Sequence, residues 1–163
     1  MTTTQRAALT GTELDAWRSF LRAHAHVTRV LEAELVAEHD LALPSYEVLM
    51  HLADAPGRRL RMTELADRVL LSRSGLTRLV DRLEKEGLVE RASCPNDARG
   101  THAVLSEAGV ARLQTAAPTH LRGVVEHVTS KLSAVEVAQL AALMHKLLDG
   151  APADAGSCGL VEP

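Results

Sequence analysis

Apolar residues recur at intervals of three and four over most of the chain, a spacing that predicts a mainly helical protein. The pattern is longest over residues 10–40, where one face collects Leu14, Trp17, Leu21, His24, Thr28, Leu31 and Leu35. Thr10 and Glu13 have the spacing of a capping box, which marks the start of this helix. A helix of this length is typical of one that packs against something outside its own small core.

The middle of the chain carries three shorter helical patterns with recognisable ends. Pro44 opens the first, over 44–54, because proline suits the first turn of a helix. A short helix over 62–70 follows. The third begins after Ser72, a good N-cap residue, and ends before Gly87, which suits the left-handed conformation beyond a helix end. Its predicted apolar stripe consists of Leu76, Leu79, Val80 and Leu83.

Short runs with strand character accompany these helices. Residues 58–61 are long enough for one strand, and residues 88–92 and 101–105 flank a turn-rich segment, which predicts a hairpin. Two helices joined by a short turn and followed by a hairpin form a winged helix-turn-helix, in which the second helix enters the major groove of DNA.

The C-terminal third is again helical in pattern. Ser106 opens a long helical region that extends to about Lys131, but Pro118 lies inside it, so we expect a kink or a break near Ala117. Ser133 and Glu136 form a second capping box, which opens a last helix ending at Gly150.

The predicted fold class is therefore mainly α (α+β), a winged helix-turn-helix with a small β-hairpin wing and long terminal helices. The chain of 163 residues is expected to form one domain. Its predicted parts are an N-terminal helix at 10–43, a winged helix-turn-helix core at 44–105, C-terminal helices at 106–149 and a disordered tail at 150–163.

Composition agrees with packed helices. Hydrophobic residues make up 46% of the chain but aromatic residues only 2%, so Leu, Val and Ala must build the core. No apolar run is long enough to cross a membrane, and the N-terminus lacks the pattern of a secretory signal, so we expect a cytoplasmic protein. The two cysteines, Cys94 and Cys158, are far apart and form neither a zinc-finger pattern nor a disulfide framework.

The charge is distributed unevenly. The whole chain carries a net charge of −3. Residues 56–101 contain ten Lys/Arg and seven Asp/Glu, a balance of +3, which leaves −6 for the two flanks (8 minus 14). A basic middle between acidic ends indicates a local binding face for a polyanion.

The helix after Ser72 carries the residues best suited to touch DNA. Away from its apolar stripe it presents Ser72, Arg73, Ser74, Thr77, Arg78 and Arg82. Hydroxyls and N-terminal amides suit phosphates, and Arg73 or Arg78 has the reach to contact a guanine edge. A solvated helix face is the alternative interpretation, and the hairpin that follows directly favours the DNA interpretation.

The hairpin tip, CPNDARGTH, adds two further candidates. Pro95, Asn96 and Gly100 supply turn chemistry. If strand alternation continues through the segment, Asp97 and Arg99 project to the same side. Asp97 then holds Arg99 in one orientation towards DNA.

Residues 71–109 resemble the MarR family of bacterial transcriptional regulators. The resemblance is carried by the run LEKEGL at 83–88, the Asp-x-Arg pair at 97–99, and LSEAG at 105–109, where Ser106 stands for the usual threonine. The order of predicted elements extends it to residues 12–149. The resemblance implies a homodimer whose first and last helices intertwine, and a near-palindromic operator on double-stranded DNA. It also implies a regulator, in many members a repressor, that a small aromatic or anionic effector modulates.

The effector site is harder to place. Trp17, Tyr46 and Glu47, with Arg78, resemble the cleft of a urate-responsive branch of the family, although Trp17 also fits a dimer core. Metal- or redox-responsive regulation is an alternative. Cys94 lies at the start of the wing, and the eight histidines include no HxxxH pair, so a metal site has to be assembled in space.

Other classes of protein fit the sequence less well. No GxSxG motif, Walker loop, dinucleotide-binding glycine pattern or HExxH motif is present, so we expect neither an enzyme nor a bound cofactor. Winged helices also bind proteins, and an adaptor therefore remains an alternative. The arginines and hydroxyls of the 72–82 segment favour DNA over a protein partner.

Overall fold

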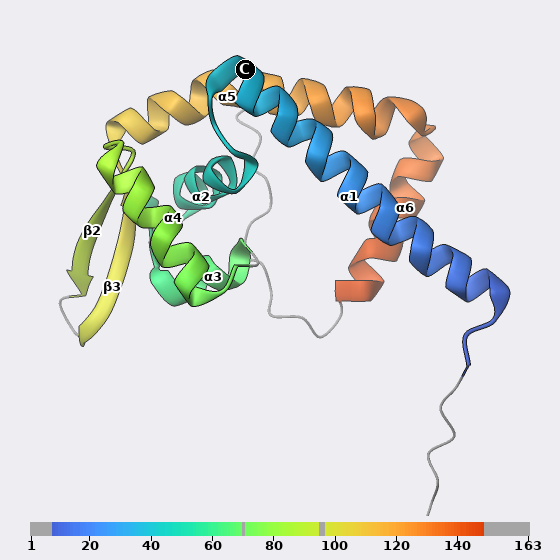
Figure 1. Cartoon of the computed structure of the whole chain (residues 1–163), viewed down its shortest axis with the longest axis horizontal. Coiled ribbons are helices and arrows are strands. Elements are labelled where there is room, and N and C mark those ends of the chain that lie inside the picture. Colours follow the sequence, from blue (N-terminus) through green and yellow to red (C-terminus); the bar gives the residue numbers. More distant parts are fainter. Residues whose placement is uncertain (1–7, 70, 95–96, 149–163) are drawn as a thin grey trace, which may run out of the picture.

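The computed structural model describes residues 8–69, 71–94 and 97–148, without the side chains of residues 94–100. The molecule is shaped like an arch (Figure 1). A compact unit of short helices and a small sheet forms one foot, α1 and α6 form the other, and α5 spans the top. In the part of the chain that is described, no helix is long and apolar enough to cross a membrane.

Helix α1 (Gly11–His39) confirms the long N-terminal helix. Thr10 Oγ1 accepts the Glu13 amide at 3.3 Å, and Glu13 Oε2 accepts the Thr10 amide at 2.7 Å, so the predicted capping box is present. Asp40 ends the helix in a left-handed conformation (φ 48°). Of the predicted stripe, Leu31 and Leu35 are buried, whereas the N-terminal half of α1 is exposed in the single chain.

The winged-helix unit contains the predicted order of elements. The bounds are α2 Leu43–Asp54, a 3-10 turn η1 Pro56–Arg58, β1 Arg59–Arg61, α3 Met62–Arg68 and α4 Arg73–Lys85. All four apolar residues of the predicted α4 stripe are buried. Ser72 Oγ accepts the Gly75 amide at 3.1 Å, and Gly87 has φ 73°, so both predicted ends of α4 are confirmed.

Strands β2 (Val89–Cys94) and β3 (Asp97–Leu105) form the predicted hairpin and are longer than expected. They join β1 in an antiparallel sheet of order β1-β3-β2. The β2–β3 register is irregular between Ser93 and Cys94, close to the hairpin tip. Strand β1 connects the root of the wing to the helices, so only the distal part of the hairpin projects from the winged-helix unit.

One hydrophobic core lies between α2, α3, α4, the sheet and the facing parts of α1 and α5. Leucine, valine and alanine dominate it, as the composition predicted, and Tyr46 is its buried aromatic residue. Its largest fully buried side chains are Leu35, Val48, Leu49, Leu52, Leu65, Leu76, Val80, Leu83 and Val89.

Helices α5 (Glu107–His127) and α6 (Ala134–Leu148), joined by η2 (Thr129–Lys131), complete the chain. Of the kink or break expected near Ala117, the break is wrong, because α5 continues through Pro118. Ala116 and Thr119, on either side of the proline, are both buried, and this packing holds the helix across the missing backbone hydrogen bond.

The second capping box is confirmed at the start of α6. Ser133 N donates to Glu136 Oε2 at 2.8 Å, and Glu136 N donates to Ser133 Oγ at 3.4 Å. The predicted end of the helix at Gly150 and the tail at 150–163 lie outside the described residues.

Candidate nucleic-acid interface

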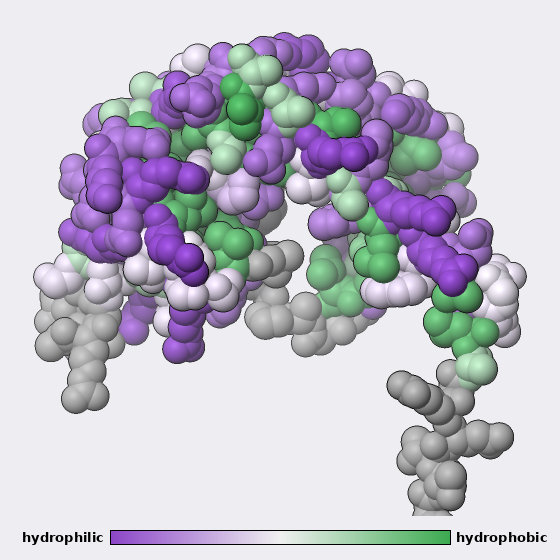
Figure 2. Space-filling model, in the orientation of Figure 1, coloured by the Kyte–Doolittle hydropathy of each residue, from purple (hydrophilic) through white to green (hydrophobic). Residues whose placement is uncertain are grey.

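The outward face of α4 brings together five of the predicted DNA-contacting residues. The buried stripe occupies the opposite side of the helix, and Ser72, Arg73, Ser74, Thr77 and Arg78 are all exposed. Figure 2 shows hydrophilic residues gathered over this side of the molecule. The amphipathic pattern of α4 therefore fixes which side faces the core and which side is available to a partner.

Hydrogen bonds along α4 order this face. Thr77 Oγ1 donates to the Arg73 carbonyl at 2.8 Å, and Arg78 Nε approaches the Ser74 carbonyl at 3.4 Å. The Ser72 and Ser74 hydroxyls lie 3.3 Å apart at the N-terminal end. Among the described side chains, neither Arg73 nor Arg78 forms an ion pair, so both guanidinium groups are available to phosphates or bases.

Arg82 is placed differently from the other candidates. Its Nη2 donates to Ser45 Oγ on α2 at 3.0 Å, and the Ser45 side chain is buried. Arg82 also borders a cavity of about 230 Å³ that Asp40 and Glu86 help to line. Its guanidinium therefore joins α4 to α2 rather than extending the face formed by Arg73 and Arg78.

Arg91 on β2 is a residue of the interface that sequence reasoning missed. Its guanidinium pairs with Asp81 at 2.6 Å and with Glu84 at 2.7 Å, both on α4, and it approaches the Thr77 carbonyl at 3.4 Å. The root of the wing is thus tied to α4, and one arginine charge offsets part of the charge of two carboxylates next to the candidate interface. Strand alternation alone carries no signal for this contact.

The wing candidates lie partly outside the described structure. Asp97 and Arg99 belong to β3, but their side chains are outside the described residues, so the predicted brace between them stays a prediction. The same holds for the Cys94 side chain, and Cys158 lies wholly outside. Regular pairing extends to Ser93 and Thr101, and Cys94 pairs with Asp97 beyond the irregularity, which places the backbone of both candidates at the far end of the wing.

The predicted effector residues do not converge within one chain. Trp17 is 52% exposed and stacks on Phe20, with 6.1 Å between ring centroids, in the part of α1 that Figure 1 shows extending away from α2. Tyr46 on α2 is buried against His120 of α5, at 4.5 Å between centroids. Glu47 is the half-buried neighbour of Tyr46.

The pKa of Glu47 is shifted by its surroundings. Burial raises its pKa, the nearby Glu32 carboxylate raises it further, and His24 partly offsets the effect. Glu32 and His24 also line a shallow groove along α1, together with Thr28 and Val36. This groove and Glu47 lie where the N-terminal helix leaves the winged-helix unit.

Two histidines that the sequence places on one face of α5 have separate environments. His120 stacks on Tyr46, and burial lowers its pKa. His127 Nε2 lies 2.6 Å from Glu34 Oε1 on α1. The two histidines therefore do not form a pair.

The fold and the site together define a winged helix-turn-helix protein with an exposed polar face on α4, the candidate nucleic-acid interface, and a separate helical arm. A model of the MarR family matches residues 39–100. The chain belongs to the MarR family of transcriptional regulators, as its likeness to solved members over nearly its whole length shows.

Two solved structures from Streptomyces coelicolor illustrate this likeness. Sco3205, a MarR family regulator crystallised in complex with DNA, is 34% identical, with a TM-score of 0.85 over 95% of this chain and 97% of that one. AbsC, another MarR family regulator, is 32% identical, with a TM-score of 0.81 over 88% and 97%. The regulator MhqR of Bacillus subtilis is 34% identical over 56% of this chain, but the match spans only 59% of MhqR.

Proposed function

We propose that this protein is a transcriptional regulator, acting as a repressor, that binds a near-palindromic operator on double-stranded DNA as a homodimer. The observation that carries the proposal is the exposed face of α4, where Arg73 and Arg78 have no acidic partner among the described residues. The protein's site of action is then the chromosome, in the cytoplasm.

Each residue of this face has a distinct proposed role. Ser72 and Ser74 lie at the N-terminus of α4, where backbone amides and the helix dipole favour a phosphate. Thr77 and Arg78 lie one turn further along and are proposed to reach base edges in the major groove. Arg73 is proposed to contact the backbone or a base, and Arg99 on the wing to contact the adjacent backbone with Asp97 as its brace.

A second copy of the chain is the proposed partner of the arm, which we define as residues 11–25 of α1, residues 119–127 of α5, and α6. Figure 1 shows α6 and the N-terminal part of α1 together, away from the winged-helix unit, with α5 leading to them. α6 has no buried residue within the single chain. The exposed large apolar residues of the arm are Trp17, Phe20, Leu21, Leu121, Val125, Val135, Leu140, Leu143, Leu147 and Leu148. Apolar surface of this extent is typical of an obligate interface.

Dimerisation sets the distance between the two α4 faces that contact DNA. Two-fold symmetry presents two copies of α4 to successive major grooves, about 34 Å apart, which requires a near-palindromic site. On this proposal the boundaries are 44–105 for the DNA-binding core and 10–43 with 106–149 for dimerisation. Trp17 is then an interface residue, and Tyr46 and Glu47 remain the proposed contacts of a small aromatic or anionic effector.

Fluorescence anisotropy with a selected operator and a scrambled duplex, each at two salt concentrations, tests the proposal. Wild-type affinity for both duplexes is expected to fall as salt rises, because phosphate contacts release counterions. Arg78→Ala should weaken operator binding by about 1–3 kcal/mol and spare the scrambled duplex if Arg78 reads a base. Arg29→Ala, on the exposed part of α1, is the matched control and should leave both affinities unchanged.

Three outcomes separate the alternatives. An equal loss on both duplexes for Arg78→Ala makes the residue a phosphate contact and keeps the proposal. Affinity that is insensitive to salt contradicts DNA binding and points instead to a protein partner. A loss for Arg29→Ala as large as that for Arg78→Ala contradicts the assignment of the interface to α4.

A further inference from the structure

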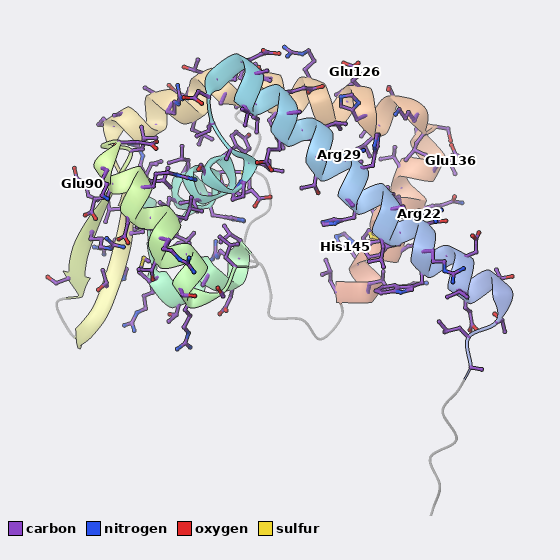
Figure 3. All side chains as sticks on the ribbon, in the orientation of Figure 1. Arg22, Arg29, Glu90, Glu126, Glu136 and His145 are labelled. Atoms are coloured by element: carbon purple, nitrogen blue, oxygen red, sulfur yellow. The ribbon has the colours of Figure 1, made fainter. Side chains whose placement is uncertain are left out.

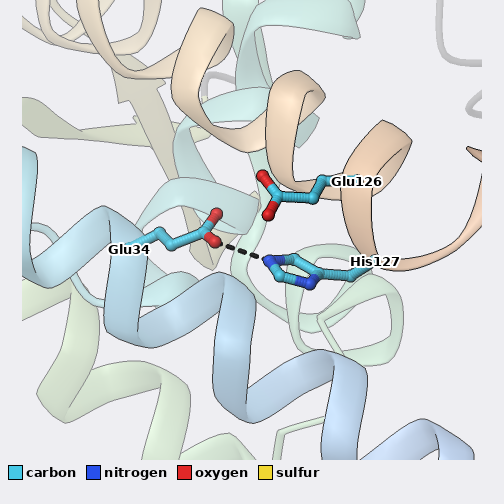
Figure 4. A group of neighbouring side chains, drawn as sticks. All are labelled: Glu34, Glu126 and His127. Atoms are coloured by element: carbon cyan, nitrogen blue, oxygen red, sulfur yellow. Dashed lines mark hydrogen bonds and ion pairs between the residues drawn. The ribbon is translucent and has the colours of Figure 1, made fainter.

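Three side chains of types that can hold a metal ion converge where α1 crosses α5. Glu34 comes from α1, and Glu126 and His127 come from the C-terminal end of α5, more than ninety positions later in the sequence. One ligand atom from each residue lies within 4.8 Å of the other two. Figure 4 shows the three groups pointing towards one another, and Figure 3 places Glu126 on the part of α5 that spans the arch.

The Glu34 carboxylate is held tightly between the helices. Its Oε1 lies 2.6 Å from His127 Nε2. Its Oε2 is buried and has no hydrogen-bond partner. Gly123, one turn before His127, makes the room, since a Cβ there would lie 2.5 Å from Glu34 Oε2 and 2.7 Å from a Leu31 methyl group. A buried carboxylate oxygen without a partner is unfavourable, and a cation or a donor in contact with it would remove that cost.

Glu38, one turn further along α1, has partners for both of its carboxylate oxygens. Glu38 Oε2 accepts the Thr119 hydroxyl at 2.8 Å, and its other oxygen pairs with Arg122. No arginine or lysine of the described residues pairs with Glu34 or Glu126. The cluster therefore carries two carboxylate charges with only one imidazole between them.

We propose that Glu34, Glu126 and His127 form a binding site for a divalent cation of the Zn²⁺ class. Imidazole nitrogen with two carboxylate oxygens is a donor set that Zn²⁺ accepts, with water as the fourth ligand, and the imidazole disfavours Mg²⁺ and Ca²⁺. Zinc–ligand bonds of about 2.0–2.2 Å put tetrahedral donors roughly 3.4 Å apart. Small side-chain rotations bring the three donors to this spacing, and the ion then replaces the contact between Glu34 and His127.

An ion bound at this site links α1 to the C-terminal end of α5, next to the segments that form the arm. The ion also neutralises the two carboxylates and gives the buried Glu34 oxygen a partner. Any effect on operator affinity rests on the proposed function, because it requires the position of the arm to bias the spacing of the two α4 helices. Binding of the ion does not depend on that role.

Calorimetric titration of the chelator-stripped, full-length protein with Zn²⁺ tests the site in the absence of DNA. Wild type is expected to bind one ion per chain, and its thermal midpoint should rise with Zn²⁺ because the ion binds only the folded state. Glu126→Gln, Glu34→Gln and His127→Gln should each weaken binding at least about tenfold. His26→Gln removes an exposed α1 histidine outside the cluster and should bind like wild type.

The exposed position of Glu126 keeps the test decisive, because Glu126→Gln is tolerated even if the two more buried variants fold poorly. Binding that is absent in wild type, or unchanged in both Glu126→Gln and His127→Gln, overturns the proposal and leaves Glu34 and His127 as an ion pair between helices. Titration with Co²⁺ gives a second readout. A visible absorption spectrum typical of low-coordinate Co²⁺ that appears in wild type and is absent in His127→Gln supports the proposed site. Since no step uses DNA, a failure here is distinct from a failure of the proposed function.

Discussion

Gly109, near the start of α5, is the position where one added methyl group should do most damage. A Cβ at this residue would lie 2.2 Å from the Leu88 carbonyl oxygen and 2.6 Å from Leu105 Cδ1. The oxygen belongs to the backbone and is itself the acceptor of the Ser106 amide at 3.1 Å. Gly109→Ala must therefore move the first turn of α5 away from the start of β2 or break that hydrogen bond.

The expected loss of stability in Gly109→Ala is the sum of two destabilising contributions and one stabilising contribution. Overpacking of this kind costs about 1–3 kcal/mol, and loss of the Ser106–Leu88 hydrogen bond about 0.5–1.5 kcal/mol more. Alanine regains about 1 kcal/mol over glycine from helix propensity. We expect Gly109→Ala to lower the free energy of unfolding by about 0.5–3.5 kcal/mol, which corresponds to a fall in Tm of roughly 1–14 °C for a chain of this size.

Thermal and urea unfolding, followed by circular dichroism at one fixed protein concentration, measure this effect. The fixed concentration matters because the stability of a dimer depends on it. Gly11→Ala is the matched control, since a Cβ there meets nothing within 4 Å, and it should be neutral or slightly stabilising. A Gly109→Ala protein as stable as wild type would refute the steric argument and leave the glycine of the LSEAG run without a structural reason.

Two further variants test the arm and the buried acid. Leu143 is 54% exposed on α6, and Leu143→Glu should convert the dimer to a monomer, as measured by sedimentation velocity. Ala92→Glu, at an exposed position on β2, is the control and should remain a dimer. A Leu143→Glu protein that is still dimeric would place the interface elsewhere. Because burial raises the pKa of Glu47, the folded state holds a proton longer than the unfolded state, and stability falls as pH rises through that range. Glu47→Gln should accordingly be more stable than wild type at neutral pH, with the difference vanishing as pH drops towards 4, and a pH-independent difference contradicts this origin.

The parts of the fold that sequence alone predicted correctly are those with local causes. Both capping boxes, the apolar stripe of α4 and the left-handed Gly87 each depend on residues within about one or two turns. A kink or a break was expected near Ala117, and the break, which is wrong, also came from a local rule. Packing of Ala116 and Thr119 against distant segments overrides that rule, and no spacing within α5 reports it.

The candidate interface was predictable in outline but not in detail. The stripe of α4 correctly left Arg73 and Arg78 on the outside. Arg82 follows the same helical period, yet it contacts Ser45, which lies 37 positions earlier in the chain. The identity of such a partner depends on how α2 and α4 pack, and no local pattern contains that information.

The distribution of charge at the candidate interface also could not be predicted from the sequence. A count over residues 56–101 gives +3, but the count does not say which charges face the partner. The structure distinguishes them, because Arg91 is engaged with Asp81 and Glu84, and Arg58 pairs with Glu107 at 2.7 Å. What remains beside the hydroxyls of α4 is Arg73 and Arg78, unopposed among the described residues. Which cations stay available on this face is thus decided by long-range pairing, and a local count of charges does not report it.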